Sequence, residues 1–235
     1  MQKTVVGSNM SVKDETTTGD RPENALRITE IFLSIQGESR SIGYPTVFIR
    51  LTGCPLRCQY CDTAYAFTGG EWKSLQTIID QVALYNTRHV TVTGGEPLAQ
   101  KHCLQLLSRL CDAGYEVSLE TSGAISVDDV DNRVIKVMDI KTPASGEVDR
   151  NLYDNINALS ANDQVKFVIC DRADYDWAKS IIDEYSLLNR CEILMSPSYS
   201  QLKGELLAEW ILSDRLAVRF QMQLHKILWG DQPGR

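Results

Sequence analysis

Short apolar segments alternate with longer segments of helical periodicity along most of this 235-residue chain, and this alternation limits the folds open to it. Strands are predicted at residues 46–51, 89–93, 116–120, 134–140, 164–169, 191–195 and 217–223. Helices are predicted between them, at residues 75–84, 101–113, 153–161, 175–187 and 202–213. Strands that alternate with helices build parallel βαβ units, so the pattern predicts an α/β fold.

Composition and charge narrow the class of protein. The chain is 43% hydrophobic, which suffices for a globular core, and its net charge of −7 argues against a nucleic-acid binder. No apolar run approaches the ~20 residues that cross a bilayer, and the N-terminus lacks the features of an export signal. The chain is therefore expected in the cytoplasm, where seven unevenly placed cysteines indicate metal or redox chemistry rather than disulfides.

The chain is predicted to contain one folded domain. Residues 1–24 are polar and have no sustained hydrophobic period, so they are predicted to be a disordered tail or an artefact of the start site. Residues 25–235 are predicted to fold together, because no low-complexity linker divides them.

Polar residues follow four successive predicted strands, at residues 93–97, 120–123, 139–143 and 196–198. The carboxyl ends of parallel strands meet on one face of a barrel or open sheet, and ligands bind there. Each segment alone could be an ordinary polar loop. Together they predict a binding site on that face.

The loop after the first predicted strand carries the strongest chemical signal. Cys54, Cys58 and Cys61 have the spacing C-x3-C-x2-C. Three thiolates on one loop can bind three irons of a cuboidal iron–sulfur cluster and leave the fourth iron open. A structural zinc site is the alternative, but it needs four Cys or His ligands, and no histidine lies near this loop in the sequence. The spacing favours an iron–sulfur cluster.

This spacing, with Tyr60 before the last cysteine, resembles the signature of the radical S-adenosylmethionine (SAM) superfamily. The resemblance implies a partial or distorted (β/α) barrel in which the three cysteines hold a [4Fe–4S] cluster. It implies SAM as a second cofactor, chelated by the open iron and cleaved to a radical by one electron. Flavodoxin or ferredoxin is the type of electron donor implied.

Further segments resemble the 7-carboxy-7-deazaguanine synthase family within that superfamily. These segments are residues 31–38, 47–50, 61–63, 93–97 and 223–226. The resemblance implies conversion of 6-carboxy-5,6,7,8-tetrahydropterin to 7-carboxy-7-deazaguanine by radical ring contraction with loss of ammonia, a step toward queuosine. It also implies Mg2+ as a cofactor and a homodimer as the assembly.

The same resemblance assigns substrate roles. Arg50 lies in an apolar strand and is implied to bind the substrate carboxylate, with a structural salt bridge as the alternative. The Thr63 hydroxyl is implied to bind Mg2+, with a turn or helix cap as the alternative. The residues implied to contact the pterin are Ile35, Gln36, Gly37, Glu38 and Thr93.

A second group of residues is implied to surround SAM. These are Tyr60, Cys61, Asp62, Gly95, Ser122, Asp139, Ile140, Lys141, Ser196, Pro197, Ser198 and Tyr199. Gly95 is expected to let the backbone approach the amino group of SAM, where a side chain would obstruct it. For Lys141 a solvated surface lysine is the alternative.

Two other functions remain open from the sequence. A radical SAM activase would share the cysteine loop but act on a partner protein through a docking groove, and Arg50 with the segment around Gln36 favours a small molecule instead. An iron–sulfur electron carrier or a zinc-binding interaction module would not need four polar strand ends.

Overall fold

The computed structural model describes residues 23–199, 201–230, 232 and 234. Among these residues, nine strands form one sheet in the order β3-β1-β2-β4-β5-β6-β7-β8-β9. The strands are β1 (Ala25–Ile35), β2 (Pro45–Leu51), β3 (Glu71–Ser74), β4 (His89–Gly94), β5 (Glu116–Thr121), β6 (Ile135–Asp139), β7 (Gln164–Ile169), β8 (Glu192–Pro197) and β9 (Arg219–Phe220). Strands β2 and β4 to β9 run parallel, whereas β1 is antiparallel to both β2 and β3.

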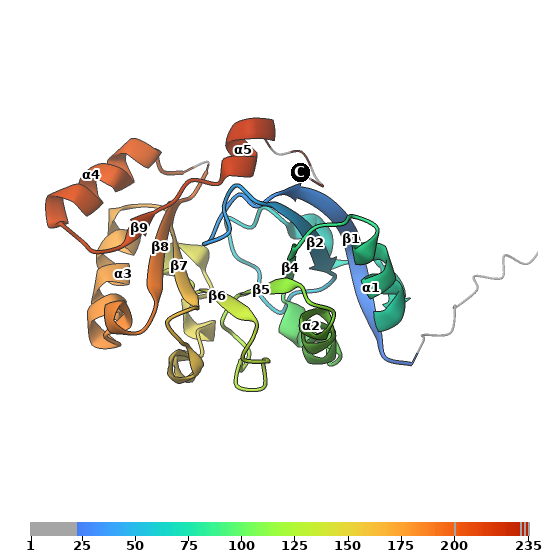
Figure 1. Cartoon of the computed structure of the whole chain (residues 1–235). Helices are drawn as coiled ribbons and strands as arrows, with labels where there is room; N and C mark the ends of the chain where they lie inside the picture. Colours follow the sequence, from blue (N-terminus) through green and yellow to red (C-terminus); the bar gives the residue numbers. More distant parts are fainter. Residues whose placement is uncertain (1–22, 200, 231, 233, 235) are drawn as a thin grey trace, which may run out of the picture.

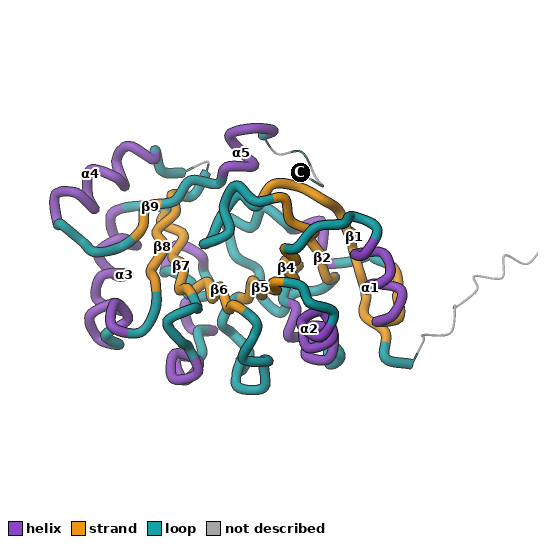
Figure 2. Tube along the Cα trace, in the orientation of Figure 1, coloured by secondary structure: helices purple, strands orange, loops and turns teal. Residues whose placement is uncertain are grey.

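The helices lie mainly outside a curved sheet. The α-helices are α1 (Leu75–Ala83), α2 (Cys103–Asp112), α3 (Arg172–Glu184), α4 (Gly204–Asp214) and α5 (Leu224–Trp229). The 3-10 helices are η1 (Ala64–Phe67), η2 (Pro97–Ala99), η3 (Pro143–Ser145), η4 (Val148–Arg150), η5 (Tyr153–Ala158) and η6 (Leu187–Asn189). Figure 1 shows α1, α2 and α3 on the convex side and α5 across the open side of the arc. Figure 2 shows the strands as one continuous arc that does not close into a full barrel.

Local sequence explains where the helices begin and how they pack. The Ser74 hydroxyl accepts a hydrogen bond from an N–H in the first turn of α1, and Asp171 does the same for α3. In α2 the buried residues Cys103, Leu106, Leu107 and Leu110 recur at helical spacing on one face. Burial of each leucine contributes about 2 kcal/mol, so this face docks the helix on the sheet.

The hydrophobic core divides into two clusters along the same sheet. The first cluster packs α1 and α2 against β1, β2, β4 and β5, with Val92 and Leu119 at its centre. The second cluster packs α3 and α4 against β6, β7 and β8 around Phe167 and Tyr175. Both clusters lie on the helical side of the sheet, which leaves the concave side to other residues.

The predicted α/β class and the partial barrel are confirmed, with three local differences. The predicted strand 217–223 is only the two-residue β9, because register pairs connect it solely with Leu194 and Met195 of β8. The predicted helix 153–161 is the 3-10 helix η5, in which the Asn155 amide donates to the Gly123 and Ile125 carbonyls. Strands β1 and β3 and helix α5 were not predicted.

The predicted tail at residues 1–24 lies outside the described residues, except for Glu23 and Asn24, which form a turn before β1. Among the helices that the structure describes, none has the length and apolar character to cross a membrane.

Candidate active site

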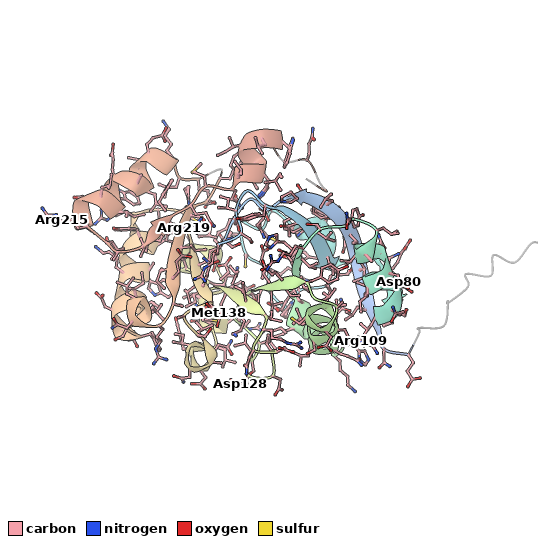
Figure 3. All side chains as sticks on the ribbon, viewed as in Figure 1. Asp80, Arg109, Asp128, Met138, Arg215 and Arg219 are labelled. Carbon is pink, nitrogen blue, oxygen red and sulfur yellow. The ribbon has the colours of Figure 1, made fainter. Side chains whose placement is uncertain are left out.

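A cavity of about 600 Å3 lies on the concave side of the sheet, near the carboxyl ends of β2 and β4 to β7. Figure 3 shows side chains filling this concave side, whereas the labelled Asp80, Arg109 and Asp128 lie on the outer side. Ligands of parallel sheets bind at the carboxyl ends of the strands. The cavity therefore occupies the position predicted from the four polar strand ends.

Most residues that the sequence assigned to a site line this cavity. They are Ile35, Gln36, Glu38, Arg50, Cys54, Cys58, Tyr60, Cys61, Asp62, Thr63, Thr93, Gly95, Ser122, Asp139, Lys141, Ser198 and Tyr199. Gly37, Ile140, Ser196 and Pro197 are not among its lining residues. Ile140 belongs to the second hydrophobic cluster, the Ser196 hydroxyl accepts from the Gln221 amide, and Pro197 borders a smaller neighbouring cavity.

The three predicted cluster ligands lie on the loop between β2 and η1, called here the cluster loop (residues 53–63). Within it the Cys61 N–H donates to the Cys58 carbonyl at 3.1 Å, and the Gln59 N–H donates outward to Ser145 O at 3.0 Å. Burial raises the pKa of Cys54 and raises that of Cys58 to about 11. Coordination by a metal would deprotonate such thiols, because metal binding and proton release are linked.

This set of donors fits a cuboidal cluster better than a single ion. Among the described residues, no group of three His, Cys, Asp or Glu side chains could hold one metal ion. The irons of a cuboidal cluster are separate and each takes one thiolate, so its ligands need not converge on one point. Cys54, Cys58 and Cys61 around one cavity meet that requirement, whereas a zinc site needs four convergent ligands.

Gly95 allows the end of β4 to approach the cluster loop. A Cβ at Gly95 would lie 2.2 Å from the Gly53 carbonyl oxygen and 2.7 Å from Cys54 Cβ. The Gly95 N–H donates to Leu51 O at 3.1 Å, and the Glu96 N–H donates to Gly53 O at 2.9 Å. From the sequence, the missing side chain was expected to make room for a cofactor. In the structure the space is filled by the cluster loop itself.

Glu96 is fully buried and joins the ends of β4 and β5. Its carboxylate accepts from the Ser122 N–H at 2.7 Å and the Ser122 hydroxyl at 2.5 Å. The Thr121 hydroxyl and the Leu98 N–H, each at 3.0 Å, complete its hydrogen bonds. Because the Ser122 hydroxyl donates to Glu96, it can meet a ligand only as an acceptor.

Asp139 and Lys141 form a buried ion pair, with Lys141 Nζ 3.1 Å from Asp139 Oδ2. Burial lowers the pKa of Lys141, but Asp139 together with Cys58 and Glu96 outweighs burial and leaves the pKa raised. The alternative of a solvated lysine is therefore wrong, because Lys141 is only 8% exposed. Asp139 Oδ1 is buried without a hydrogen-bond partner among the described residues, so a hydroxyl donor of a bound nucleoside fits here.

Arg50 is held by its neighbour across the antiparallel pair of β1 and β2. Its Nε donates to Glu30 Oε1 at 2.7 Å, and the Tyr65 hydroxyl donates to the same oxygen at 2.8 Å. The rings of Phe32 and Tyr65 each lie 5.8 Å from Arg50 Cζ. Within the described part of the chain, only Nε is hydrogen-bonded, which leaves two terminal amino groups to bind a carboxylate.

Gln36 and Thr93 both donate to the carboxylate of Glu120. The Gln36 amide donates to Thr91 Oγ1 at 3.1 Å and to Glu120 Oε1 at 3.4 Å, and its oxygen accepts from the Glu38 N–H. The Thr93 hydroxyl donates to Glu120 Oε2 at 2.9 Å. Both predicted substrate contacts thus line the cavity but already have protein partners.

Glu38 and Lys166 form the closest ion pair in the cavity, with Lys166 Nζ 2.6 Å from Glu38 Oε2. Burial raises the pKa of Glu38, but the Lys166 ammonium outweighs burial and leaves the pKa lowered. Burial, and then Glu38, raise the pKa of Glu120. Glu38 Oε1 is buried and has no hydrogen-bond partner among the described residues. The cavity therefore holds an ionised acceptor beside a carboxyl that takes up a proton more readily.

Helix α5 closes one side of the cavity. Lys226 Nζ lies 3.1 Å from Asp62 Oδ2 on the cluster loop, and the Leu224 N–H donates to Gly37 O at 3.0 Å. A Cβ at Gly37 would lie 2.3 Å from His225 Nδ1, so a side chain at this position would displace the His225 ring. The helix therefore connects the segment after β1 with the cluster loop.

Thr63 immediately precedes η1, but its side chain makes no capping hydrogen bond there. Its hydroxyl instead donates to Asp62 Oδ1 at 2.8 Å. Burial raises the pKa of Asp62, but Lys226, the Thr63 hydroxyl and Lys166 together outweigh burial and lower the pKa to about 2. The oxygen of Thr63 lines the cavity and keeps lone pairs for a hard cation such as Mg2+.

Four residues that line the cavity were not predicted to belong to the site: Glu120, Lys166, His225 and Lys226. One signal was present for Lys166, a cation in an otherwise apolar strand pattern at residues 164–169. Residues two apart in a strand share a face, which places Lys166 on the same side as Val168. No local pattern marked its partner, because Glu38 lies 128 residues earlier in the chain.

Known proteins resemble this chain in sequence and in fold. The Radical SAM superfamily matches residues 48–186. The 7-carboxy-7-deazaguanine synthase of Chlorobaculum tepidum is 46% identical over 88% of this chain and 96% of its own length. The corresponding protein of Koribacter versatilis is 39% identical over 87% of this chain and 97% of its own length.

A solved structure supports the fold independently. The crystal structure of QueE from Escherichia coli superposes with a TM-score of 0.71 at 23% identity and covers 86% of this chain and 95% of that one. At this identity the structural likeness establishes the partial barrel, and the sequence relatives establish the family. The chain belongs to the radical SAM superfamily and, within it, to the 7-carboxy-7-deazaguanine synthase family.

Proposed function

We propose that this chain converts 6-carboxy-5,6,7,8-tetrahydropterin to 7-carboxy-7-deazaguanine. The observation that carries the proposal is one cavity shared by the three-cysteine loop, Arg50 and the Glu38–Lys166 ion pair. A substrate with a carboxylate and a ring edge of donors and acceptors matches these charges. A bounded cavity suits a small molecule better than the partner protein of an activase.

The cluster loop and the strand ends would hold the cofactors. Cys54, Cys58 and Cys61 would bind a [4Fe–4S] cluster, which with SAM supplies radical chemistry that begins with hydrogen-atom abstraction. The unpartnered Asp139 oxygen and the Lys141 ammonium would bind the polar groups of SAM. The further SAM contacts proposed are those predicted residues that line the cavity: Tyr60, Asp62, Gly95, Ser122, Ser198 and Tyr199.

The substrate would be held by charge at one end and by hydrogen bonds at the other. Arg50 would bind the carboxylate through its terminal amino groups, while Glu30 holds the guanidinium from behind. Glu38 Oε1 would accept from the ring edge, beside Ile35, Gln36, Gly37 and Thr93. The Thr63 oxygen would bind Mg2+ together with the substrate.

Further partners belong to the same proposal. A reductant such as flavodoxin or ferredoxin would supply the electron, and the enzyme would act in the cytoplasm as a homodimer. The support for a dimer is an open strand edge: in the part of the chain that the structure describes, β3 pairs with Ala25–Ile28 of β1, and no strand pairs with residues 29–35 on that side.

The test is anaerobic reconstitution followed by spectroscopy and turnover. Addition of SAM should change the electron paramagnetic resonance signal of the reduced cluster, because SAM chelates its open iron. Carboxy-tetrahydropterin should then yield 7-carboxy-7-deazaguanine, detected by mass spectrometry. A cluster signal insensitive to SAM would indicate an electron carrier, and a SAM-sensitive cluster without pterin turnover would indicate another radical SAM reaction.

A further inference from the structure

Asp174 is a buried carboxylate outside the cavity, in the first turn of α3, and it is only 1% exposed. Three donors converge on its oxygens at 3.0 Å each. The Ala144 N–H donates to Oδ1, and the Thr142 hydroxyl and the Cys170 N–H donate to Oδ2. A carboxylate accepts all three, whereas an asparagine offers one oxygen and turns an amino group toward a donor.

Two of these donors belong to residues 142–147, called here the strap, which follow β6 and include η3. Inside the strap the Ser145 hydroxyl donates to the Thr142 carbonyl at 2.6 Å and accepts from the Glu147 N–H at 3.0 Å. Thr142 and Ser145 are fully buried. The strap is therefore a compact turn that Asp174 anchors at two of its residues, while the Thr142 hydroxyl also lies 3.1 Å from the Val168 carbonyl of β7.

The strap in turn holds the cluster loop on both sides of Cys58. The Arg57 N–H donates to Glu147 Oε1 at 2.5 Å, and the Gln59 N–H donates to the Ser145 carbonyl at 3.0 Å. These two hydrogen bonds hold the peptide groups 56–57 and 58–59, and Cys58 lies on the short segment between them. Among the hydrogen bonds of the described residues, those that link α3 to the cluster loop run through the strap.

We propose that Asp174 is a positioning residue that fixes Cys58 for cluster binding through the strap. The proposal rests on the proposed function, because it assumes that Cys58 is a cluster ligand. A preorganised ligand loop loses less conformational freedom when the cluster binds, so a released loop should hold iron less tightly. The contacts that carry it span separate parts of the chain, from the first turn of α3 to the loop after β2.

Hydrogen exchange of the full chain, before and after cluster reconstitution, tests the positioning directly. In Asp174→Asn, the Arg57 and Gln59 amides should exchange about tenfold faster, as expected for the loss of one charge-assisted hydrogen bond. Asp163→Asn is the control for general destabilisation, since Asp163 is a buried carboxylate of equal exposure that accepts from the Lys136 N–H and Ser160 and pairs with Lys136 Nζ, all away from the loop. It should leave exchange at residues 57 and 59 unchanged.

A second variant keeps the test decisive where Asp174→Asn fails to fold. Glu147 is partly exposed, so Glu147→Ala should fold while it removes the acceptor of the Arg57 N–H. Exchange as slow as in the wild type, either at residue 57 in Glu147→Ala or at residues 57 and 59 in folded Asp174→Asn, would overturn the proposal. Faster exchange in both, with Asp163→Asn unaffected, supports it.

The cluster provides a second readout. A ferrous chelator should remove iron from reconstituted Asp174→Asn about tenfold faster than from Asp163→Asn, and equal rates in the two variants would overturn the proposal. A wild-type protein that takes up no cluster would refute the proposed function instead, while the exchange measurement would still report whether Asp174 holds the loop.

Discussion

Replacement of Lys166 by Met would remove the ammonium that lies 2.6 Å from Glu38 Oε2 while it retains most of the side-chain volume. Glu38 would remain buried beside Glu120 without its cation. In the wild type, the folded pKa of Glu38 is lowered, so the pair stabilises the protein above the unfolded pKa and this contribution is lost as pH falls. In the variant the sign reverses, because an unpaired buried carboxylate has a raised pKa.

The size of the effect follows from the pH interval over which Glu38 must take up a proton. The pKa of an unfolded glutamate is about 4.3, and that of an unpaired buried one is about 8. Each pH unit between these values costs about 1.4 kcal/mol, so Lys166→Met should lose about 1 kcal/mol at pH 5 and about 4 kcal/mol at pH 7.5. Removal of one partner of a buried ion pair costs about 3–5 kcal/mol, which agrees with the larger value.

Urea denaturation of the chain under reducing conditions at pH 5 and pH 7.5 measures this difference. Glu38→Gln in the Lys166→Met background should recover most of the loss at pH 7.5, since it removes the unpaired charge. Lys136→Met is the matched control, because Lys136 and Asp163 form a buried ion pair outside the cavity. This variant should lower the free energy of unfolding and leave the KM for the pterin unchanged. Equal losses for Lys166→Met at both pH values would refute the reasoning.

Three further substitutions test the site. Arg50→Ala should lower kcat/KM for the pterin about 150-fold, the equivalent of about 3 kcal/mol for a charged hydrogen-bond pair, with cluster content unchanged; wild-type kinetics would remove Arg50 from the site. Gly95→Ala should reduce the iron bound per chain, because its Cβ would lie 2.7 Å from Cys54 Cβ, and full iron content would contradict this. Gly37→Ala should displace His225 and speed hydrogen exchange in α5, whereas unchanged exchange would show that the contact can adapt.

The parts of the site that sequence could predict are those encoded within a few residues. The spacing of Cys54, Cys58 and Cys61 places three thiols within eight residues of one another in any fold, and in the structure all three line one cavity. Arg50 was recognisable because a cation within an apolar strand needs a partner. That partner, Glu30, lies across an antiparallel strand that was not predicted.

The fold class was also predictable, because the pattern that identifies a strand or a helix is encoded within a few residues. Alternating periods of two and 3.6 residues identified most strands and helices, since the period decides which face is apolar. The sequence could not reveal that β1 and β3 extend the sheet in the antiparallel sense. Strand β1 mixes exposed and buried residues over 11 positions without a clean alternation.

The sequence by itself determined which chemical groups this protein has and which of them lie together locally, because neighbours along the chain stay neighbours in any fold. Tertiary structure alone decided which distant groups meet. Glu38 pairs with Lys166 across 128 residues, and Asp174 anchors Thr142 across 32. These contacts depend on strand order and on the curvature of the sheet, which bring several elements to one face, and no local pattern specifies that arrangement.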